Sequence, residues 1–277
     1  MAFVQAVISA DVPDDAADFL SSATLWPFLK EDQAAVAAAR ACAGETPFIP
    51  PTRPVAVSSA LVRLAGASLL TAMTPAIRSA VGPSQYCVKT PDGTEAVLFG
   101  VRTARESRNL WTMQLDITNA FNEVSRQRIW QQLNADPALA PLIPFFRLMY
   151  LDRNGPLWYY PPGHCSPWAT LASEEGSRQG CVFGTALFGI GYAPFLRWLD
   201  DRCTQGVHQG VPFSFADDTT VVGCPHTLAS IVADSETALA DLTGLRLNRT
   251  KIKTLPPLSR PQWQRSPCKR LLPPSPR

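Results

Sequence analysis

The chain has 277 residues, of which 46% are hydrophobic, so it can bury a sizeable core in one or two domains. Its formal net charge of +2 excludes a strongly basic or acidic composition. This net charge neither indicates nor excludes binding of nucleic acid, because enzymes that act on nucleic acid often concentrate their basic residues in a cleft. The seven cysteines are odd in number and form no CxxC pair, which argues against a disulfide framework or a zinc site.

Neither a signal peptide nor a membrane span is expected. The N-terminus has no cationic start before an apolar run, and aspartates occur early in the chain. The most membrane-like stretch, 181–196, is interrupted by glycines and a proline and is shorter than the roughly 20 residues that a span needs. We therefore expect this stretch to lie in a buried helix.

The first part of the chain predicts short elements around an insertion. Asp32 can cap an alanine-rich helix, which Gly44 ends, within an insertion at about 31–51. A proline-rich loop, 47–54, follows it. Ser58 or Ser59 can cap the next helix. The expected elements are a helix at 14–22, a strand at 25–30, helices at 33–43, 59–73 and 94–103, and a turn at Asp92-Gly93.

The second part alternates apolar strands with longer helices. A strand at 111–115 runs into Asp116, and a hairpin at 213–222 carries Asp217 and Asp218 at its tip. Gly244 fits the end of a helix. The remaining expected elements are helices at 125–133, 179–203 and 227–242, a strand at 157–160, and extended structure from Leu245.

Three carboxylates are the leading candidates for chemistry. Asp116 ends one apolar strand, and Asp217 and Asp218 lie between two others, so joining the strand ends would place Asp116 beside Asp217. Carboxylate oxygens are ligands that Mg²⁺ prefers. Two such ions, about 3.5–4 Å apart, can hold both oxygens of an in-line displacement at phosphorus. An Asp-Asp pair alone would be an ordinary exposed turn, so the combination carries the interpretation.

Four segments resemble reverse transcriptase motifs and occur in the order typical of that family. They are Leu115–Asn122 with Asp116 and an aromatic, Glu175–Cys181 with its Gly-x-x-Gln-Gly core, Phe215–Asp218, and the Gly-Leu-x-Leu-Asn segment Gly244–Lys251. Upstream, 53–64 and 85–96 resemble the fingers blocks of the non-LTR retrotransposon group. The resemblance covers roughly 12–255 apart from the insertion.

This resemblance implies an RNA-directed DNA polymerase core of α+β fold. It implies a palm, an antiparallel sheet backed by helices, with partial fingers and no recognisable thumb. The expected division is a fingers region at 1–110, a palm at 111–255 and a basic, proline-rich, disordered tail at 256–277. The implied ligands are an RNA template, a DNA primer, dNTPs and two Mg²⁺ ions, with Mn²⁺ as a substitute. Analogy with retroelements implies nuclear action.

By the same resemblance, Asp116 and Asp217 are metal ligands, with Asp218 in support and the backbone carbonyl of Ile117 completing the shell. Phe121 would pack under the incoming sugar and exclude a 2′-hydroxyl. Taken alone, Phe121 would be an ordinary core phenylalanine.

The remaining site residues would contact template and nucleotide. Gln179 and Gly180 would lie where template and nucleotide meet, at a turn where Arg178 could simply be solvated. Candidates for binding the triphosphate are Arg53, Arg63 and Lys30, because cationic side chains suit phosphate. Lys251 would act as a general acid to pyrophosphate, although Arg249, Lys251 and Lys253 could equally form one exposed strand face.

Several departures from the family pattern keep other interpretations open. The insertion separates Lys30 from Arg53, and Thr250 precedes Lys251 where the family has the reverse order. A decayed, inactive retroelement fragment that at most binds nucleic acid is the main alternative. A viral-type RNA polymerase palm is a second, against which Phe121 argues. A structural or partner-binding protein that reuses the fold is a third.

Overall fold

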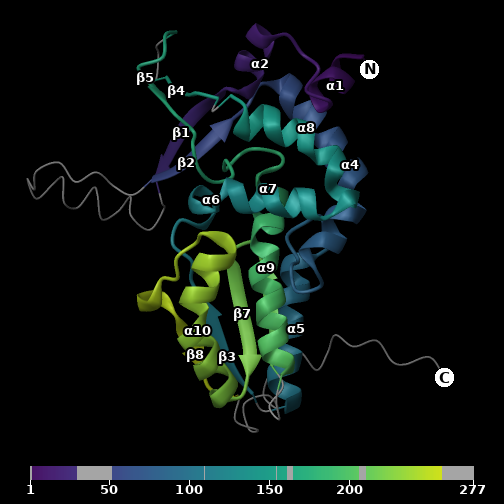
Figure 1. Ribbon diagram of the computed structural model, residues 1–277. Coiled ribbons are helices and arrows are strands. Elements are labelled where there is room, and N and C mark those ends of the chain that lie inside the picture. Colours follow the sequence, from purple (N-terminus) through teal and green to yellow (C-terminus); the bar gives the residue numbers. More distant parts are fainter. Residues whose placement is uncertain are drawn as a thin grey trace, which may run out of the picture.

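The computed structural model describes residues 2–29, 52–108, 110–153, 155–160, 165–205 and 210–257. Two four-stranded sheets lie at opposite ends of the described part of the molecule, with long helices running between them (Figure 1). They are called the upper and the lower sheet after their places in Figure 1. This arrangement confirms the expected α+β fold. The helical elements are α1 (Ala2–Ile8), α2 (Asp14–Ser21), α4 (Ala60–Val81), α5 (Gly93–Arg108), α6 (Ala120–Glu123), α7 (Arg126–Ala135), η1 (Pro137–Leu142), α8 (Ile143–Phe146), η2 (Arg147–Leu151), α9 (Gly184–Thr204), α10 (Pro225–Thr243) and η3 (Arg249–Lys251). The strands are β1 (Ala23–Leu29), β2 (Thr52–Val57), β3 (Trp111–Leu115), β4 (Leu157–Tyr159), β5 (Ala169–Leu171), β6 (Val211–Phe215), β7 (Asp218–Gly223) and β8 (Lys253–Leu255).

The lower sheet has the order β6-β7-β3-β8, and all of its pairs are antiparallel. Helices cover both of its faces. On one face the hydroxyl of Tyr192 in α9 lies 2.9 Å from Oγ1 of Thr219 in β7. On the other face Gly100 of α5 lies against the ring of Phe213 in β6. The expected antiparallel sheet backed by helices is therefore present.

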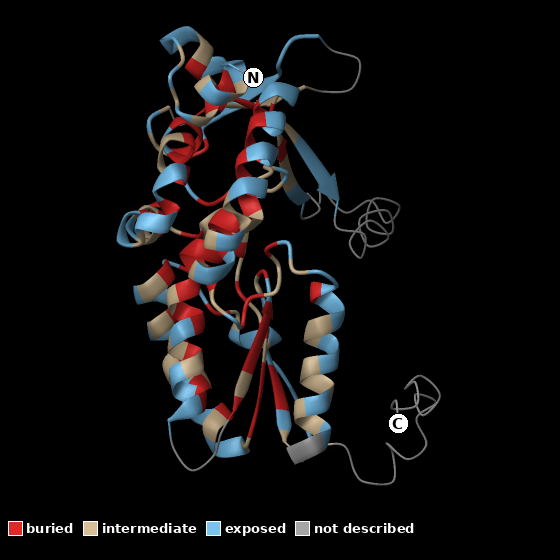
Figure 2. Ribbon diagram, turned by 90° about the vertical axis from the view of Figure 1, so that its right-hand side faces the viewer, coloured by how far each residue is buried: buried red, intermediate tan, exposed pale blue. Residues whose placement is uncertain are grey.

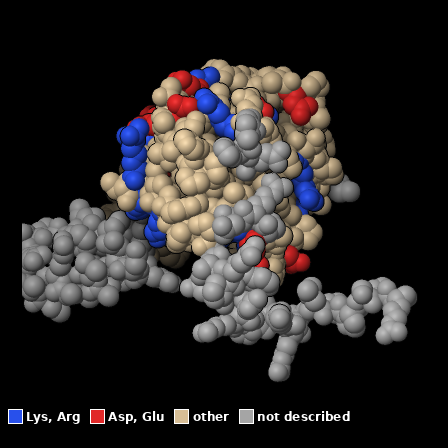
Figure 3. Space-filling view, turned by 90° about the horizontal axis from the view of Figure 1, so that it is seen from below, with Lys and Arg blue, Asp and Glu red and all other residues tan. Residues whose placement is uncertain are grey.

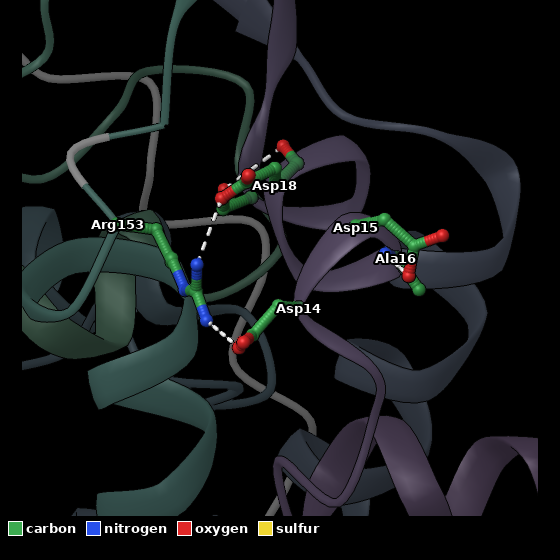
Figure 4. Close-up of polar contacts among 6 residues, drawn as sticks. Asp14, Asp15, Ala16, Asp18 and Arg153 are labelled. Atoms are coloured by element: carbon green, nitrogen blue, oxygen red, sulfur yellow. Dashed lines mark hydrogen bonds and ion pairs between the residues drawn. The ribbon is translucent and has the colours of Figure 1, made fainter.

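The upper sheet has the order β2-β1-β4-β5, and β1 pairs in parallel with β4. β4 and β5 come from the segment assigned to the palm, whereas α5 comes from the segment assigned to the fingers and covers the lower sheet. A division at residues 110 and 111 thus separates segments that pack together. Arg153, which follows η2, links this end to α2 through ion pairs with Asp14 and Asp18 (Figure 4).

The core follows α9, which packs against α4, α7, α10 and β6. Buried residues gather along the inner helices and strands (Figure 2). Rings on α9 form a row from Phe188 through Tyr192 and Phe195 to Trp198, with neighbouring centroids 5.3–5.4 Å apart. A Cβ on Gly191 would lie 2.8 Å from Cγ1 of Ile129 in α7. The glycine therefore allows α7 to pack closely on α9.

Several predicted boundaries were wrong. α4 continues to Val81 through Pro75 instead of ending at Met73, and the long helix begins at Gly184 instead of Gln179. The end of the predicted loop, Thr52 to Pro54, lies in β2. Pro54 is tolerated there because β2 is an edge strand. The predicted insertion helix and most of the predicted tail fall outside the described residues.

Within the described ranges, α4 alone is long and apolar enough to cross a membrane by length and composition, with a hydropathy of 1.4. This is weak evidence, because core helices pass the same test. Here α4 packs against α1, α9 and η1.

Seen from below, most of the surface in view is uncharged, and Lys and Arg side chains gather at its sides (Figure 3).

Candidate functional site

A cleft of about 520 Å³ lies where the tip of the β6-β7 hairpin, the loop after β3 and the start of β2 meet. It gathers side chains from segments far apart in the sequence. Its lining residues are Thr52, Arg53, Pro54, Asp116, Ile117, Thr118, Asn119, Ala120, Phe121, Asn122, Gln179, Asp217, Asp218, Asn248 and Lys251.

Strand register places the three aspartates together. Leu115 in β3 pairs with Thr219 in β7, so one further step along this register brings Asp116 opposite Asp218. Phe215 pairs with Asp218, which leaves Ala216 and Asp217 as a two-residue turn. The sequence-based expectation that the strand ends would bring Asp116 beside Asp217 agrees with this arrangement.

The segment after α10 fixes the loop that carries Asp116. The Asn248 amide donates to the Asp116 carbonyl at 2.8 Å, and the Thr118 amide donates to the Arg246 carbonyl at 2.9 Å. Ile117 and Leu247 thus form the non-hydrogen-bonded pair of an antiparallel bridge. The carbonyl of Ile117 therefore points away from the segment that contains Leu247 and makes no hydrogen bond to it.

Burial raises the pKa of Asp217, and the nearby Asp218 and Asp116 carboxylates raise it further. A backbone hydrogen bond and the Arg53 guanidinium act in the opposite direction. In the described residues, no group of three or more His, Cys, Asp or Glu side chains is arranged to hold a metal ion. The donor chemistry nevertheless fits a divalent cation, because a cation would relieve the repulsion among these carboxylates.

Lys251 faces the same carboxylates, with Nζ 3.8 Å from Oδ2 of Asp116. It lies in η3, whereas Lys253 lies in β8 and Arg249 pairs with Glu236 on α10. The alternative of one exposed strand face for these three cations was therefore wrong.

The loop from Gly176 to Gly180 is hydrogen-bonded to α6 on one side and to β2 on the other. The Ser177 amide donates to the Phe121 carbonyl at 2.7 Å, and the Ala56 amide donates to the Gln179 carbonyl at 2.7 Å. Gly180 has a φ of +89°, and a Cβ there would lie 2.8 Å from Cγ1 of Val55. Glycine is required at this close approach.

Two buried arginines, Arg126 and Arg178, fix that loop in place through hydrogen bonds to backbone carbonyls. Arg126 donates to the carbonyls of Tyr150, Ser173, Glu175 and Gly176. Burial, followed by repulsion from Arg178, lowers the pKa of Arg126 to about 10. The two guanidinium carbons lie 5.2 and 5.4 Å from the Tyr150 ring centroid, a cation–π arrangement.

Comparison with known proteins adds the family. A family model described as reverse transcriptase (RNA-dependent DNA polymerase) matches residues 50–269. The chain belongs to the reverse transcriptase family.

Curated relatives confirm the resemblance to non-LTR retrotransposon reverse transcriptases. The chain is 32% identical over 142 residues to the retrotransposable element SLACS 132 kDa protein of Trypanosoma brucei gambiense, covering 51% of this chain and 11% of that protein. It is 24% identical over 235 residues to the Pol polyprotein from the type-2 retrotransposable element R2DM of Drosophila melanogaster, covering 76% of this chain and 21% of that protein. The chain thus spans a small part of each relative.

Solved telomerase structures share the fold. A Candida albicans telomerase in complex with the TWJ fragment of telomeric RNA has a TM-score of 0.60 at 9% identity, covering 90% of this chain and 43% of that chain. A Candida tropicalis apo telomerase truncated from its C-terminal domain has a TM-score of 0.56 at 11% identity, covering 85% and 50%. These identities show similarity of fold alone.

The structure brings most of the predicted site residues to the cleft but not all of them. Arg63 is exposed on the outer side of α4, because Val62 and Ala65 face inward, and it does not line the cleft. Gly180 packs on β2 instead of lining the cleft. Lys30 lies outside the described residues.

The possibility that Arg178 is solvated was wrong, since Arg178 is 5% exposed and donates to the carbonyls of Ser21 and Gly155. Burial lowers the pKa of Arg178.

Other residues in and around the cleft were missed in the sequence analysis. Asn119 adopts a left-handed φ of 42°, which asparagine tolerates better than most residues, and its place inside a known motif was the available signal. Gln85 and Arg126 are buried polar residues. Gln85 lies in the block 85–96, to which the resemblance assigned no site residue, and no pattern marked Arg126. The missed residues that line the cleft are Thr52, Pro54, Thr118, Asn119, Ala120, Asn122 and Asn248.

Proposed function

We propose that this chain carries the nucleotidyl-transfer centre of an RNA-directed DNA polymerase that copies a primed RNA template with dNTPs. The observation that carries the proposal is one cleft lined by Asp116, Asp217 and Asp218 together with the cations Arg53 and Lys251. Phosphoryl transfer requires carboxylates that hold metal ions next to Arg or Lys side chains that bind phosphate groups.

The acidic residues would hold divalent ions, and the reverse transcriptase family depends on such ions in general. Asp116, Asp217, Asp218 and the Ile117 carbonyl are the proposed ligands of two Mg²⁺ ions, for which Mn²⁺ could substitute. When bound, the ions supply positive charge to the triphosphate and lower the pKa of the attacking primer hydroxyl. The raised pKa of Asp217 supports this assignment, because such a carboxylate gains from a neighbouring cation.

The cationic residues would act on the leaving group. Arg53 lines the cleft from β2, across from the acidic turn, and its planar guanidinium suits a bidentate contact to phosphate oxygens. Lys251 would donate a proton from Nζ to the departing pyrophosphate oxygen. Its position 3.8 Å from Asp116 supports that role, because this places the ammonium at the carboxylate end of the cleft.

The uncharged residues would choose and position the nucleotide. Phe121 lines the cleft beside Asp116, where a ring under the sugar would exclude a 2′-hydroxyl. Gln179 lines the same cleft, and its carbonyl accepts from the Ala56 amide of β2. We propose contact between Gln179 and the nucleotide paired to the template.

The first test is incorporation of dTTP on oligo-dT annealed to poly-rA, with Mg²⁺. We expect activity in the natural chain, loss by at least about 10³-fold in Asp217→Asn, and no change in Asp201→Asn. Asp201 is an exposed aspartate on α9, away from the cleft, and matches the change in charge. Circular dichroism would verify that each variant is folded.

A folded natural chain without incorporation would contradict the proposal. Fluorescence anisotropy with labelled primer-template would then measure nucleic-acid binding separately. The chain spans only 11% and 21% of its curated relatives. By analogy with retroelements, we propose that it acts in the nucleus. Imaging of a tagged full-length protein would test the nuclear proposal.

A further inference from the structure

The turn that presents Asp217 has a backbone conformation that its sequence disfavours. Ala216, the first of its two residues, has a φ of +57°. A residue with a Cβ pays a steric penalty in this left-handed region, and glycine does not. Something outside the turn must therefore hold Ala216 in place.

Gln85 makes that contact. Its Oε1 accepts from the Ala216 amide at 2.9 Å, and its Nε2 donates to the Ala216 carbonyl at 3.1 Å. Nε2 also lies 3.3 Å from Oγ of Ser214, and Oε1 accepts from the Cys87 amide at 3.3 Å. The side chain amide thus binds both backbone groups of one residue, which a side chain with only donors or only acceptors could not do.

The segment around Gln85 is itself fixed to the hairpin. The Tyr86 amide donates to the Ser214 carbonyl at 2.8 Å, and the Ser214 amide donates to the Ser84 carbonyl at 2.7 Å. These bonds add a short parallel pairing along the outer edge of β6. The backbone of Gln85 therefore has a defined position from which its side chain reaches the turn.

We propose that Gln85 is a positioning residue that holds Ala216 in its left-handed conformation and thereby aims the Asp217 carboxylate into the cleft. Gln85 does not line the cleft and is 5% exposed, so it acts through the turn and not on substrate. The inference rests on the proposed function, because it gives Gln85 a role in placing a proposed metal ligand.

The test compares Gln85→Met with Ser84→Ala. Methionine keeps the volume of the side chain but has neither the amide donor nor the amide acceptor. Ser84 is 7% exposed on the same segment, and its hydroxyl bonds to Asp200 of α9 instead of to the turn. Its loss therefore matches the loss of a buried hydrogen bond without touching Ala216.

The first measurement is amide hydrogen exchange by NMR. We expect the Ala216 amide to exchange about tenfold faster or more in Gln85→Met and at an unchanged rate in Ser84→Ala. An unchanged rate in Gln85→Met would overturn the proposal. This measurement needs no catalysis, so faster exchange in a chain that shows no incorporation would leave the positioning contact standing and refute the proposed function instead.

The second measurement is steady-state incorporation. Gln85→Met should lower kcat at least about tenfold and leave the KM for dTTP within about twofold, because the loss is confined to the aim of one ligand. Adding Ala216→Gly should restore about tenfold, since glycine adopts this φ without the penalty. If kcat did not recover in the double variant, or if Ser84→Ala lost as much kcat, Gln85 would be an ordinary core residue and the proposal would be wrong.

Discussion

The ring of Phe121 stacks on the ring of Phe188, with centroids 4.6 Å apart and an angle of 19° between the planes. Phe188 lies on α9 and is fully buried, whereas Phe121 is half-buried and lines the cleft. The position of Phe121 is thus set by the central helix of the core. A residue that selects the sugar by its shape needs such a fixed backing.

Replacing Phe121 by valine should let the cleft accept ribonucleotides. We expect incorporation of UTP relative to dTTP to rise about 10- to 100-fold, because a smaller side chain makes room for the 2′-hydroxyl. Single-nucleotide extension would measure this ratio. Phe188→Leu is the comparison variant: it loosens the backing of the Phe121 ring but leaves that ring in the cleft, so it should raise the ratio by much less. An equal rise in Phe188→Leu would contradict a direct role for Phe121.

Replacing Lys251 by methionine should slow the chemical step. We expect kcat to fall about 10²-fold, within the range for loss of a general acid. Single-turnover extension measures that step, and Lys253→Met should be unchanged because Lys253 lies on β8 and does not line the cleft. If Lys251→Arg retained the full rate, charge alone would suffice and the proton-donor role would be wrong.

The stability of the metal-free protein should depend on Asp217. Its raised pKa means that the folded state binds this proton more tightly than the unfolded state. The free energy of unfolding should therefore fall as pH rises from the usual carboxyl pKa through the raised one.

Asp217→Asn removes this dependence and should melt at a higher temperature than the natural chain at about pH 7 in EDTA, with a smaller difference near pH 4. Thermal melts at both pH values check this expectation. A lower melting temperature for Asp217→Asn at about pH 7 would contradict it.

Alanine at Gly180 should weaken the contact between its loop and β2. The new Cβ would meet Val55 at 2.8 Å and the Ala56 carbonyl oxygen at 2.9 Å, at a φ of +89°. We expect a loss of about 2–4 kcal/mol, from the penalty of the positive φ together with overpacking.

Urea unfolding of Gly82→Ala provides the matched control for Gly180→Ala. Gly82 has a φ of +85°, and a Cβ there meets nothing within 4 Å. Its ψ of 173° places it in a positive-φ region that is almost restricted to glycine, so this variant should show the backbone penalty alone, about 1–3 kcal/mol. Equal losses in the two variants would mean that the close approach to β2 contributes nothing.

Local patterns predicted the hairpin and the strand before Asp116 because both are apolar runs next to acidic residues. Bringing these strand ends together then predicted that Asp116 and Asp217 lie side by side. Sequence could not show that Arg178 is buried, since a buried guanidinium bonded to distant carbonyls has the same local sequence as a solvated one. Gln85 was missed for the same reason, because its partners in the β6-β7 hairpin lie more than 120 residues later in the chain.

The longer elements were predicted in type but not in extent. α4 passes Pro75, a residue that usually breaks a helix. Packing of Ile77 and Val81 in the core outweighs that local preference. The pairing of β1 with β4 had no signal, since parallel pairing between short strands depends on the whole fold.

The strand before Asp116 has consequences for how the protein folds. Both neighbours of β3, namely β7 and β8, lie far later in the chain. During synthesis, β3 therefore emerges with two unpaired edges and waits for most of the remaining sequence before either edge is covered. Such long-range pairing slows folding and leaves a strand open to association with other chains. The strand that leads into the first proposed metal ligand is thus open to wrong pairing while the chain is being made.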